Sequence, residues 1–350
     1  LKLSENEYFE VRVANTSIAN ADLTGRKNGD LILIDGDTQF NSSLTVIGCT
    51  FTDISLSEKN SIVHTACHEL HFLNNTMRSC STNGVFIDHM CSVFIDGCTF
   101  TQCSSSAIKY IPQAYDETVN ESVIIQNCDF IECSGYSCVA YLSPFISRPK
   151  FFNLNISNSI HNFAIVIEMK PLTIAMNEAG EVLLQNVSFF NTHPIETAEE
   201  CGGGGCGFLY KTESSDEDRV TFTECFFERT FSSIFGGGAI LIQGDTCLNY
   251  HVEILSCHFS NCYTNANKGG AIAVETNKSV QIENCYFESC GINNNEYHDF
   301  KGGAIFVNQK SGTQSFCLIN NTFNGTQSTS DYSAVDFECS GTCPLFLIEN

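Results

Sequence analysis

The sequence predicts an all-β chain wound as a right-handed parallel β-helix, a solenoid of about ten to eleven coils with roughly 30 residues each. Three observations predict this fold. A phenylalanine recurs along the chain, an alternating apolar segment precedes it, and a second short apolar segment follows it. No segment shows the sustained 3.6-residue periodicity of an amphipathic helix.

The recurring phenylalanine marks ten units, and the steps between the markers average about 30 residues. Apolar residues stand seven and five positions before the marker in eight of the ten units; the units at Phe72 and Phe152 lack this pair. Such alternation is the period of a strand with one buried face. The markers are Phe51, Phe72, Phe100, Phe130, Phe152, Phe189, Phe227, Phe259, Phe287 and Phe323.

The position three residues before the marker is usually small or turn-forming. Glycine and asparagine tolerate the left-handed backbone that a sharp corner requires. We therefore expect the strand to bend there and the marker to point back into the interior. The residues at this position include Gly48, Gly97, Asn127, Asn186, Ser256, Asn284 and Asn320.

A second strand is predicted 7 to 18 residues after each marker, where the pattern small-apolar-x-apolar recurs. Three copies follow a Gly-Gly pair, at 237–238, 269–270 and 302–303, which indicates a tight backbone at the entry to the strand. The copies begin at Gly84, Ala107, Cys138, Ala164, Gly207, Ala239, Ala271, Ala304 and Ala334.

Parallel stacking of the units explains why the loops vary in length while the strand segments stay constant. A propeller would need four strands in each blade, and these units are too short for that. We expect residues 1–43 to form an N-terminal coil or cap and residues 44–350 to form the β-helix. The strand-like run at 345–348 leaves open that the solenoid continues beyond the sequence.

Charge and composition exclude several classes of partner. A net charge of −23 disfavours nucleic acid and anionic lipid, which both need clustered Lys and Arg. No apolar stretch approaches the roughly 18 residues that span a bilayer, so a membrane anchor would lie outside this segment. Twenty cysteines and nine N-glycosylation sequons favour an extracellular or cell-surface location. The sequons begin at Asn15, Asn41, Asn74, Asn120, Asn155, Asn186, Asn277, Asn320 and Asn324.

Cysteines recur in closely spaced pairs, and four of the pairs enclose a marker phenylalanine. We interpret the pairs as local disulfides across a corner; a ladder of buried thiols and bridges between neighbouring coils remain alternatives. Zinc is disfavoured because Cys-x-x-Cys spacing with histidine partners is absent. The candidate pairs are Cys98 with Cys103, Cys128 with Cys133, Cys201 with Cys206, Cys257 with Cys262, Cys285 with Cys290, and Cys339 with Cys343.

Two short signatures carry a family resemblance. Gly-Gly-Ala-Ile stands at 237–240, 269–272 and 302–305, and Phe-x-x-Asn stands at 72–75 and 152–155. Together they resemble the repeats of chlamydial polymorphic outer-membrane proteins and of related surface proteins from parasitic protists such as trichomonads. The resemblance implies an extracellular β-helix associated with adhesion, and the sequons and cysteines favour the protist type. In four units cysteine replaces the Asn, at Cys103, Cys133, Cys262 and Cys290.

The sequence assigns no catalytic, cofactor-binding or metal-ligating residue. Ile87-Asp88-His89 resembles a segment of pectate lyases, but the arginine-containing catalytic segment of those enzymes is not apparent. The Asp-Asp and Gly-His-Gly motifs of polygalacturonases and a Gly-x-Ser-x-Gly motif are missing. The acidic run at 213–218 leaves calcium as the one cofactor to consider.

These observations favour a non-enzymatic glycoprotein of the cell surface or extracellular space, which acts as an adhesin or as a rigid filament element. Its expected partners are host-cell or extracellular proteins and glycans, or further copies joined end to end. The irregular segments 168–181 and 191–206 are the expected contact loops. The alternative is a polysaccharide lyase or glycoside hydrolase built on the same β-helix.

Overall fold

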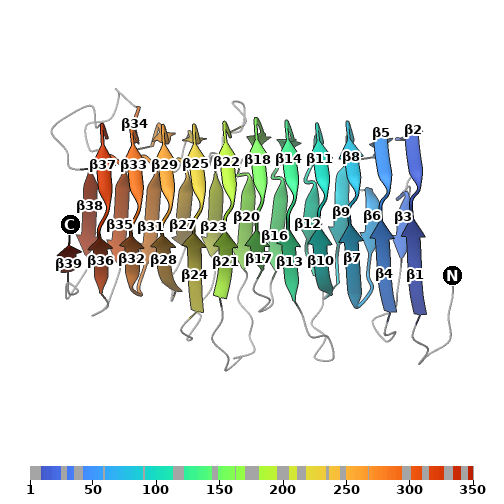
Figure 1. The fold of residues 1–350 in the computed structure, drawn as a ribbon, viewed down its shortest axis with the longest axis horizontal. Coiled ribbons are helices and arrows are strands. Elements are labelled where there is room, and N and C mark those ends of the chain that lie inside the picture. Colours follow the sequence, from blue (N-terminus) through green and yellow to red (C-terminus); the bar gives the residue numbers. More distant parts are fainter. Residues whose placement is uncertain are drawn as a thin grey trace.

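The computed structural model describes residues 9–24, 30–34, 42–57, 60–89, 91–112, 122–143, 149–161, 163–169, 181–194, 205–210, 218–233, 236–244, 250–266, 268–293, 301–309, 315–326, 334–339 and 346–349. Within these residues every regular element is a β-strand and none is a helix. The strands run from β1 (Phe9–Ala14) at one end of the molecule to β39 (Phe346–Glu349) at the other (Figure 1).

Sheet A contains 12 strands. Neighbours in the sheet are three or four elements apart in the chain, so each strand pairs with its counterpart one coil later. In spatial order the strands are β1, β4 (Ser42–Ile47), β7 (Glu69–Leu73), β10 (Ser92–Asp96), β13 (Val123–Gln126), β17 (Lys150–Phe152), β21 (Glu181–Gln185), β24 (Asp218–Thr223), β28 (Tyr250–Leu255), β32 (Val280–Glu283), β36 (Phe316–Ile319) and β39.

Sheet B contains 11 strands, most of them only three residues long. They are β2 (Ser17–Leu23), β5 (Thr50–Leu56), β8 (Thr76–Arg78), β11 (Thr99–Thr101), β14 (Asp129–Ile131), β18 (Asn155–Ser157), β22 (Ser188–Phe190), β25 (Phe226–Glu228), β29 (His258–Ser260), β33 (Tyr286–Glu288) and β37 (Thr322–Asn324).

Sheet C also contains 11 strands and corresponds to the second predicted strand of each unit. They are β3 (Ile32–Ile34), β6 (Ser61–Thr65), β9 (Asn83–Ile87), β12 (Ile108–Tyr110), β16 (Val139–Ser143), β20 (Ile165–Met169), β23 (Cys206–Tyr210), β27 (Ile240–Gly244), β31 (Ile272–Thr276), β35 (Ile305–Gln309) and β38 (Val335–Cys339). Two small sheets add β15 (Ser134–Gly135) with β19 (Ile160–His161), and β26 (Phe231–Ser232), β30 (Tyr263–Thr264) and β34 (Gly291–Ile292).

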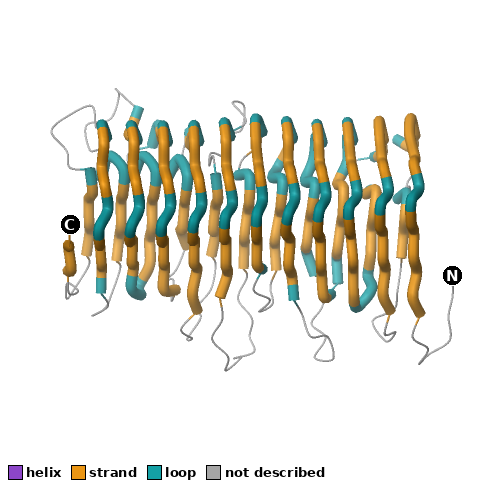
Figure 2. Tube along the Cα trace, in the orientation of Figure 1, coloured by secondary structure: helices purple, strands orange, loops and turns teal. Residues whose placement is uncertain are grey.

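The described strands pair in parallel, and the chain visits sheets A, B and C in the same order in each coil. This arrangement is a parallel β-solenoid, as the repeat predicted. Short turns link sheets A and B at the same height in successive coils (Figure 2). Strands β1 to β3 pair with β4 to β6, so residues before 43 continue the same sheets; a domain boundary at 43 stays a prediction.

The interior is a ladder of stacked rings. Phe100 and Phe130 lie directly opposite each other in β11 and β14, with ring centroids 4.9 Å apart and planes 4° from parallel. Phe189 and Phe227 repeat this contact at 4.7 Å and 3°. These side chains are completely buried, which confirms that the marker phenylalanine re-enters the core.

Two of the ten predicted markers are wrong. Met77 and Ile156, not Phe72 and Phe152, occupy the marker position in their coils. Phe72 lies five positions earlier in the repeat, opposite Val46 in sheet A, and Phe152 lies on the outer side of β17. These were the two units without the alternating apolar pair, so that pair located the strands better than the phenylalanine did.

One copy of the second pattern is displaced by two residues. The structure pairs Ile165 with Cys206, so Gly205 rather than Gly207 is the small residue at the start of β23. A Cβ on Gly207 would lie 2.5 Å from the Phe163 ring, on the outer side of the sheet. A shift of two residues keeps the strand alternation unchanged, so periodicity alone could not detect it.

The predicted corner is confirmed. The seven residues expected there have φ between 51° and 64°. A second left-handed residue, which the sequence did not predict, follows five positions later in each of these coils, for example at Gln102 and Glu132. Mixed residue types hide this second corner, although each non-glycine residue there loses roughly 1–2 kcal/mol in backbone energy.

Substitution of Phe130 by alanine should lower the free energy of unfolding by about 3–5 kcal/mol, because it opens a buried cavity between the Phe100 ring and Ile156. The same change at Phe152, on the outer side of sheet A, should cost about 1 kcal/mol or less. Urea denaturation followed by circular dichroism measures both values. Equal losses at the two positions would contradict the register described here.

Candidate functional site

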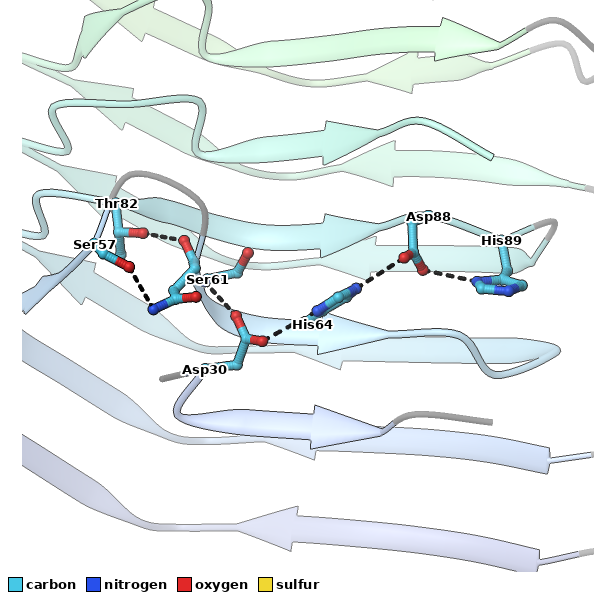
Figure 3. Close-up of polar contacts among 8 residues, drawn as sticks. Asp30, Ser57, Ser61, His64, Thr82, Asp88 and His89 are labelled. Carbon is cyan, nitrogen blue, oxygen red and sulfur yellow. Dashed lines mark hydrogen bonds and ion pairs between the residues drawn. The ribbon is translucent and has the colours of Figure 1, made fainter. Parts of the chain in front are cut away.

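A cluster of aspartate and histidine side chains lies on the outer face of sheet C, across three successive strands (Figure 3). Asp30 precedes β3, His64 is in β6, and Asp88 and His89 follow β9. His64 points outward because its neighbours in β6, Val63 and Thr65, are buried in the core.

His64 lies between two carboxylates from different coils. Its Nδ1 is 3.2 Å from Asp30 Oδ2 and its Nε2 is 3.0 Å from Asp88 Oδ2. A neutral imidazole has one N–H group, so only the imidazolium donates to both oxygens. The hydrogen bond to Asp88, followed by that to Asp30, raises the pKa of His64, although partial burial opposes this.

Asp88 connects His64 to His89. Its second carboxylate oxygen, Oδ1, lies 2.8 Å from His89 Nδ1. Burial alone would raise the pKa of Asp88, but the hydrogen bonds from the two histidines outweigh it and hold the pKa below its usual value. The aspartate therefore stays ionised, and its contact with His89 Nδ1 orients that ring.

A backbone N–H group holds Asp30 in place, and side chains of the neighbouring coils hold the turn that supplies it. Its Oδ1 accepts a hydrogen bond of 2.6 Å from the backbone N–H of Ser61 at the start of β6. In the preceding turn Asn60 Nδ2 donates to Ser57 Oγ at 2.6 Å, and Thr82 Oγ1 donates to the Asn60 carbonyl. The cluster thus rests on side chains from three coils.

An aromatic ring and an amine continue this outer row. The Phe86 ring packs against His64, with centroids 4.9 Å apart. Lys109 follows in β12, with Nζ 5.8 Å from the centre of the Phe86 ring, and partial burial lowers the pKa of its amine. The surface therefore combines two carboxylates, two imidazoles, a ring and an amine.

Sequence analysis found only half of this cluster. Asp88 and His89 were noted from their resemblance to a lyase segment, whereas Asp30 and His64 were missed. His64 lies opposite Phe86, and Phe86 lies opposite Lys109, each at the variable position of the small-apolar-x-apolar pattern or its equivalent. An alignment of the coils at that position would have placed His64, Phe86 and Lys109 in one column.

The closely spaced cysteines are at the two corners of a coil. Cys98 and Cys103 directly follow the left-handed residues Gly97 and Gln102, and β11 lies between them. A three-residue strand spans about 10 Å, more than the roughly 7 Å between Cα atoms that a disulfide allows. The predicted local pairing is not found in the four motifs that enclose a marker, whose cysteines are buried thiols: Cys98, Cys103, Cys128, Cys133, Cys257, Cys262, Cys285 and Cys290.

The remaining two candidate pairs are tested only in part. Cys206 is a buried thiol at the start of β23, and Cys339 is half-buried at the end of β38. Their proposed partners, Cys201 and Cys343, lie outside the described residues, so these two pairings stay predictions.

The cysteines of the first corner take the place of an inward asparagine. Asn75 accepts a hydrogen bond from the Cys49 backbone N–H at 2.8 Å and donates to the Val46 carbonyl at 2.9 Å. One coil later Cys98 makes the same two bonds through sulfur, to the Asn75 N–H at 3.5 Å and the Phe72 carbonyl at 3.3 Å. A thiol both donates and accepts, so it can replace the amide.

A buried histidine contacts a cysteine of the preceding coil. His161 Nε2 lies 2.9 Å from Cys138 Sγ, and His161 Nδ1 lies 3.3 Å from the Gly135 carbonyl. Burial lowers the pKa of His161 to about 4 and raises that of the Cys138 thiol well above its usual value. The neutral ring therefore accepts from the thiol and donates to the carbonyl, and both side chains are inaccessible to solvent.

The sequons divide by exposure. Asn277 is buried, and Asn41 and Asn120 lie outside the described residues. Asn155 is exposed and donates to Asp129 Oδ1 at 3.2 Å, so it does not form an inward ladder. Six sequon asparagines are exposed, and four of them (the first four given) occupy the first left-handed corner: Asn15, Asn74, Asn186, Asn320, Asn155 and Asn324.

The described residues contain neither a metal cluster nor a membrane-spanning helix. Among the described residues no three or more His, Cys, Asp or Glu side chains are arranged to hold a metal ion. That part of the chain also contains no helix long and apolar enough to cross a membrane. Residues 213–217 of the acidic run, and most of the two irregular segments, lie outside the described ranges.

Comparison with protein-family models, with curated proteins and with solved structures finds no match to this chain.

The stabilising effect of His64 should depend on pH. Because its pKa is raised on folding, this contribution is complete below the unfolded pKa of 6.5 and is lost as the pH rises through the folded value. The difference in unfolding free energy between wild type and His64→Gln should therefore shrink between about pH 5.5 and about pH 8.5. Urea denaturation at both pH values measures this difference.

The matched control is His71→Gln, a change at an exposed histidine on sheet A. Its difference from wild type should vary less with pH than that of His64→Gln. A constant difference for His64→Gln across the range would contradict the charged state assigned to His64.

Proposed function

We propose that this chain is a rigid extracellular rod, a right-handed parallel β-helix of about eleven coils that presents binding loops as an adhesin or surface spacer. The continuous stack of parallel strands is the observation that carries the proposal. Right-handedness is the near-universal sense for parallel strands joined within one sheet. The surface charge, the exposed sequons and the adhesin-like repeat support an extracellular location.

Rigidity follows from how the coils are joined. Each coil forms backbone hydrogen bonds to the next in three separate sheets, and the ring ladder fills the space between them. Twelve strands at a spacing of about 4.8 Å make a rod roughly 50 Å long. Such a rod holds the ends of its strands, where the connecting segments begin, at fixed separations.

Two irregular segments are the proposed contact regions. Residues 170–180 connect β20 to β21, and residues 191–205 connect β22 to β23. The strands on both sides keep their register with the neighbouring coils. Changes within 170–180 and 195–204 therefore need not disturb that register, which suits recognition of a host-cell or extracellular protein or glycan.

Replacement of residues 170–180 and 195–204 by short Gly-Ser linkers should reduce binding at least about tenfold, if these segments form the contact surface. The probe is the purified, fluorescently labelled chain on fixed epithelial cells and on a glycan microarray. Deletion of the whole of 168–206 would be a poor test, because it removes β21 and β22 and therefore one complete coil.

The matched control replaces residues 113–121, which connect β12 to β13, by the same linker. This variant should bind as the wild type does. Circular dichroism should give the same strand content for all three proteins. Full binding after replacement of the two irregular segments would reject them as the contact surface.

The outer-face cluster favours a second candidate function, a polyuronate lyase. Asp88 orients His89 so that its Nε2 can accept a proton, and Lys109 places an amine on the same face. In this reaction His89 would take the C5 proton of a uronate. The bond from C4 to its oxygen substituent would break, which gives a C4–C5 double bond and a released sugar hydroxyl after protonation.

Incubation with polygalacturonate should then produce an unsaturated product, seen as an increase in ultraviolet absorbance. His89→Gln should abolish this increase, while His71→Gln should not change it. No increase with the wild-type chain, over a range of pH and with added calcium, would reject the lyase.

A further inference from the structure

Cysteines of successive coils lie directly opposite one another. Phe100 pairs with Phe130, so Cys98, two residues earlier, faces Cys128, and the Asp129 N–H donates to the Cys98 carbonyl at 2.9 Å. Adjacent strands are about 4.8 Å apart, which is within the 4.4–6.8 Å range of Cα separations that disulfides adopt. The local partner Cys103 lies beyond that range.

Sulfur contacts show the same preference. Interaction with the Cys128 thiol lowers the pKa of the Cys98 thiol, and interaction with the Cys262 thiol raises the pKa of the Cys290 thiol. Both contacts join residues of neighbouring coils at equivalent positions in the repeat. All four side chains are buried.

These two pairs are isolated within their ladders, which makes their partners unambiguous. Asn75 precedes Cys98 and Leu154 follows Cys128 at the equivalent positions of the adjacent coils. Thr230 precedes Cys262 in the same way. Other stacks hold three or more cysteines in sequence and allow alternative partners, for example Cys225, Cys257 and Cys285.

We propose that Cys98 with Cys128, and Cys262 with Cys290, are sites of disulfide formation between consecutive coils. In each case two S–H bonds break and one S–S bond forms, with two protons and two electrons released. A small-molecule or protein disulfide accepts the electrons and is reduced to two thiols. The bonds would form as the coils dock, before burial closes the site to the oxidant.

Each such bond ties one coil to the next along the axis of the rod. It opposes local separation of the coils, which is the way a solenoid loses structure. Only the supply of oxidant in the cell rests on the proposed extracellular location, because the pairing itself follows from the register of the strands.

The test is refolding of the reduced chain in a buffer of reduced and oxidised glutathione, followed by alkylation and chymotryptic digestion without reduction. A marker phenylalanine lies between Cys98 and Cys103 and again between Cys285 and Cys290, so chymotrypsin separates the cysteines of each local motif. Mass spectrometry should find the Cys98 peptide joined to the Cys128 peptide, and Cys262 to Cys290. Links within a motif, or four alkylated thiols, would overturn the proposal.

Two variants sharpen the result. Cys128→Ser should leave Cys98 as an alkylated thiol while the link between Cys262 and Cys290 persists as an internal control. Cys103→Ser should retain the link between Cys98 and Cys128; loss of that link with the wild-type circular dichroism spectrum would count against the proposal. Oxidation in urea supplies the unfolded reference. None of these outcomes depends on whether the chain binds cells, so the two proposals fail independently.

Discussion

Backbone hydrogen bonds between successive coils determine where every other group in this molecule lies. A coil has no sheet of its own, so its peptide groups must pair with the coils before and after it. The parallel register then places equivalent side chains about 4.8 Å apart along the axis. The ring ladder formed by Phe100 and Phe130 and the outward row of His64 and Phe86 are both consequences of that register.

The same constraint brings the charged side chains of the outer-face cluster together on sheet C. Stacking normally brings like residues together, and like charges at this spacing repel. Asp30, His64 and Asp88 instead alternate in sign across three coils, so the charge on His64 is balanced by both neighbours. The cluster therefore joins the first coils electrostatically as well as through backbone hydrogen bonds.

The sequence predicted the parallel stacking, the buried marker and the first corner, because these repeat with constant spacing. It failed where a residue type departed from the repeat, as at Met77 and Ile156, or where a shift of two residues kept the alternation, as at Gly207. The constant spacing of the cysteine pairs suggested local disulfides, but the spacing arises because each cysteine follows one of two corners that are five residues apart. The partners of Asp88 could not be found from a local motif, because they are in other coils.

The first corner has a consequence for how the rod can be approached. In each of the coils with two left-handed residues, a short turn with one of them joins the sheet A strand to the sheet B strand. The edge between the two sheets therefore carries no inserted loop there (Figure 2). Four exposed sequon asparagines, Asn15, Asn74, Asn186 and Asn320, stand along that edge. Glycans attached there would shield this edge of the rod along its length and direct a binding partner to the other sides.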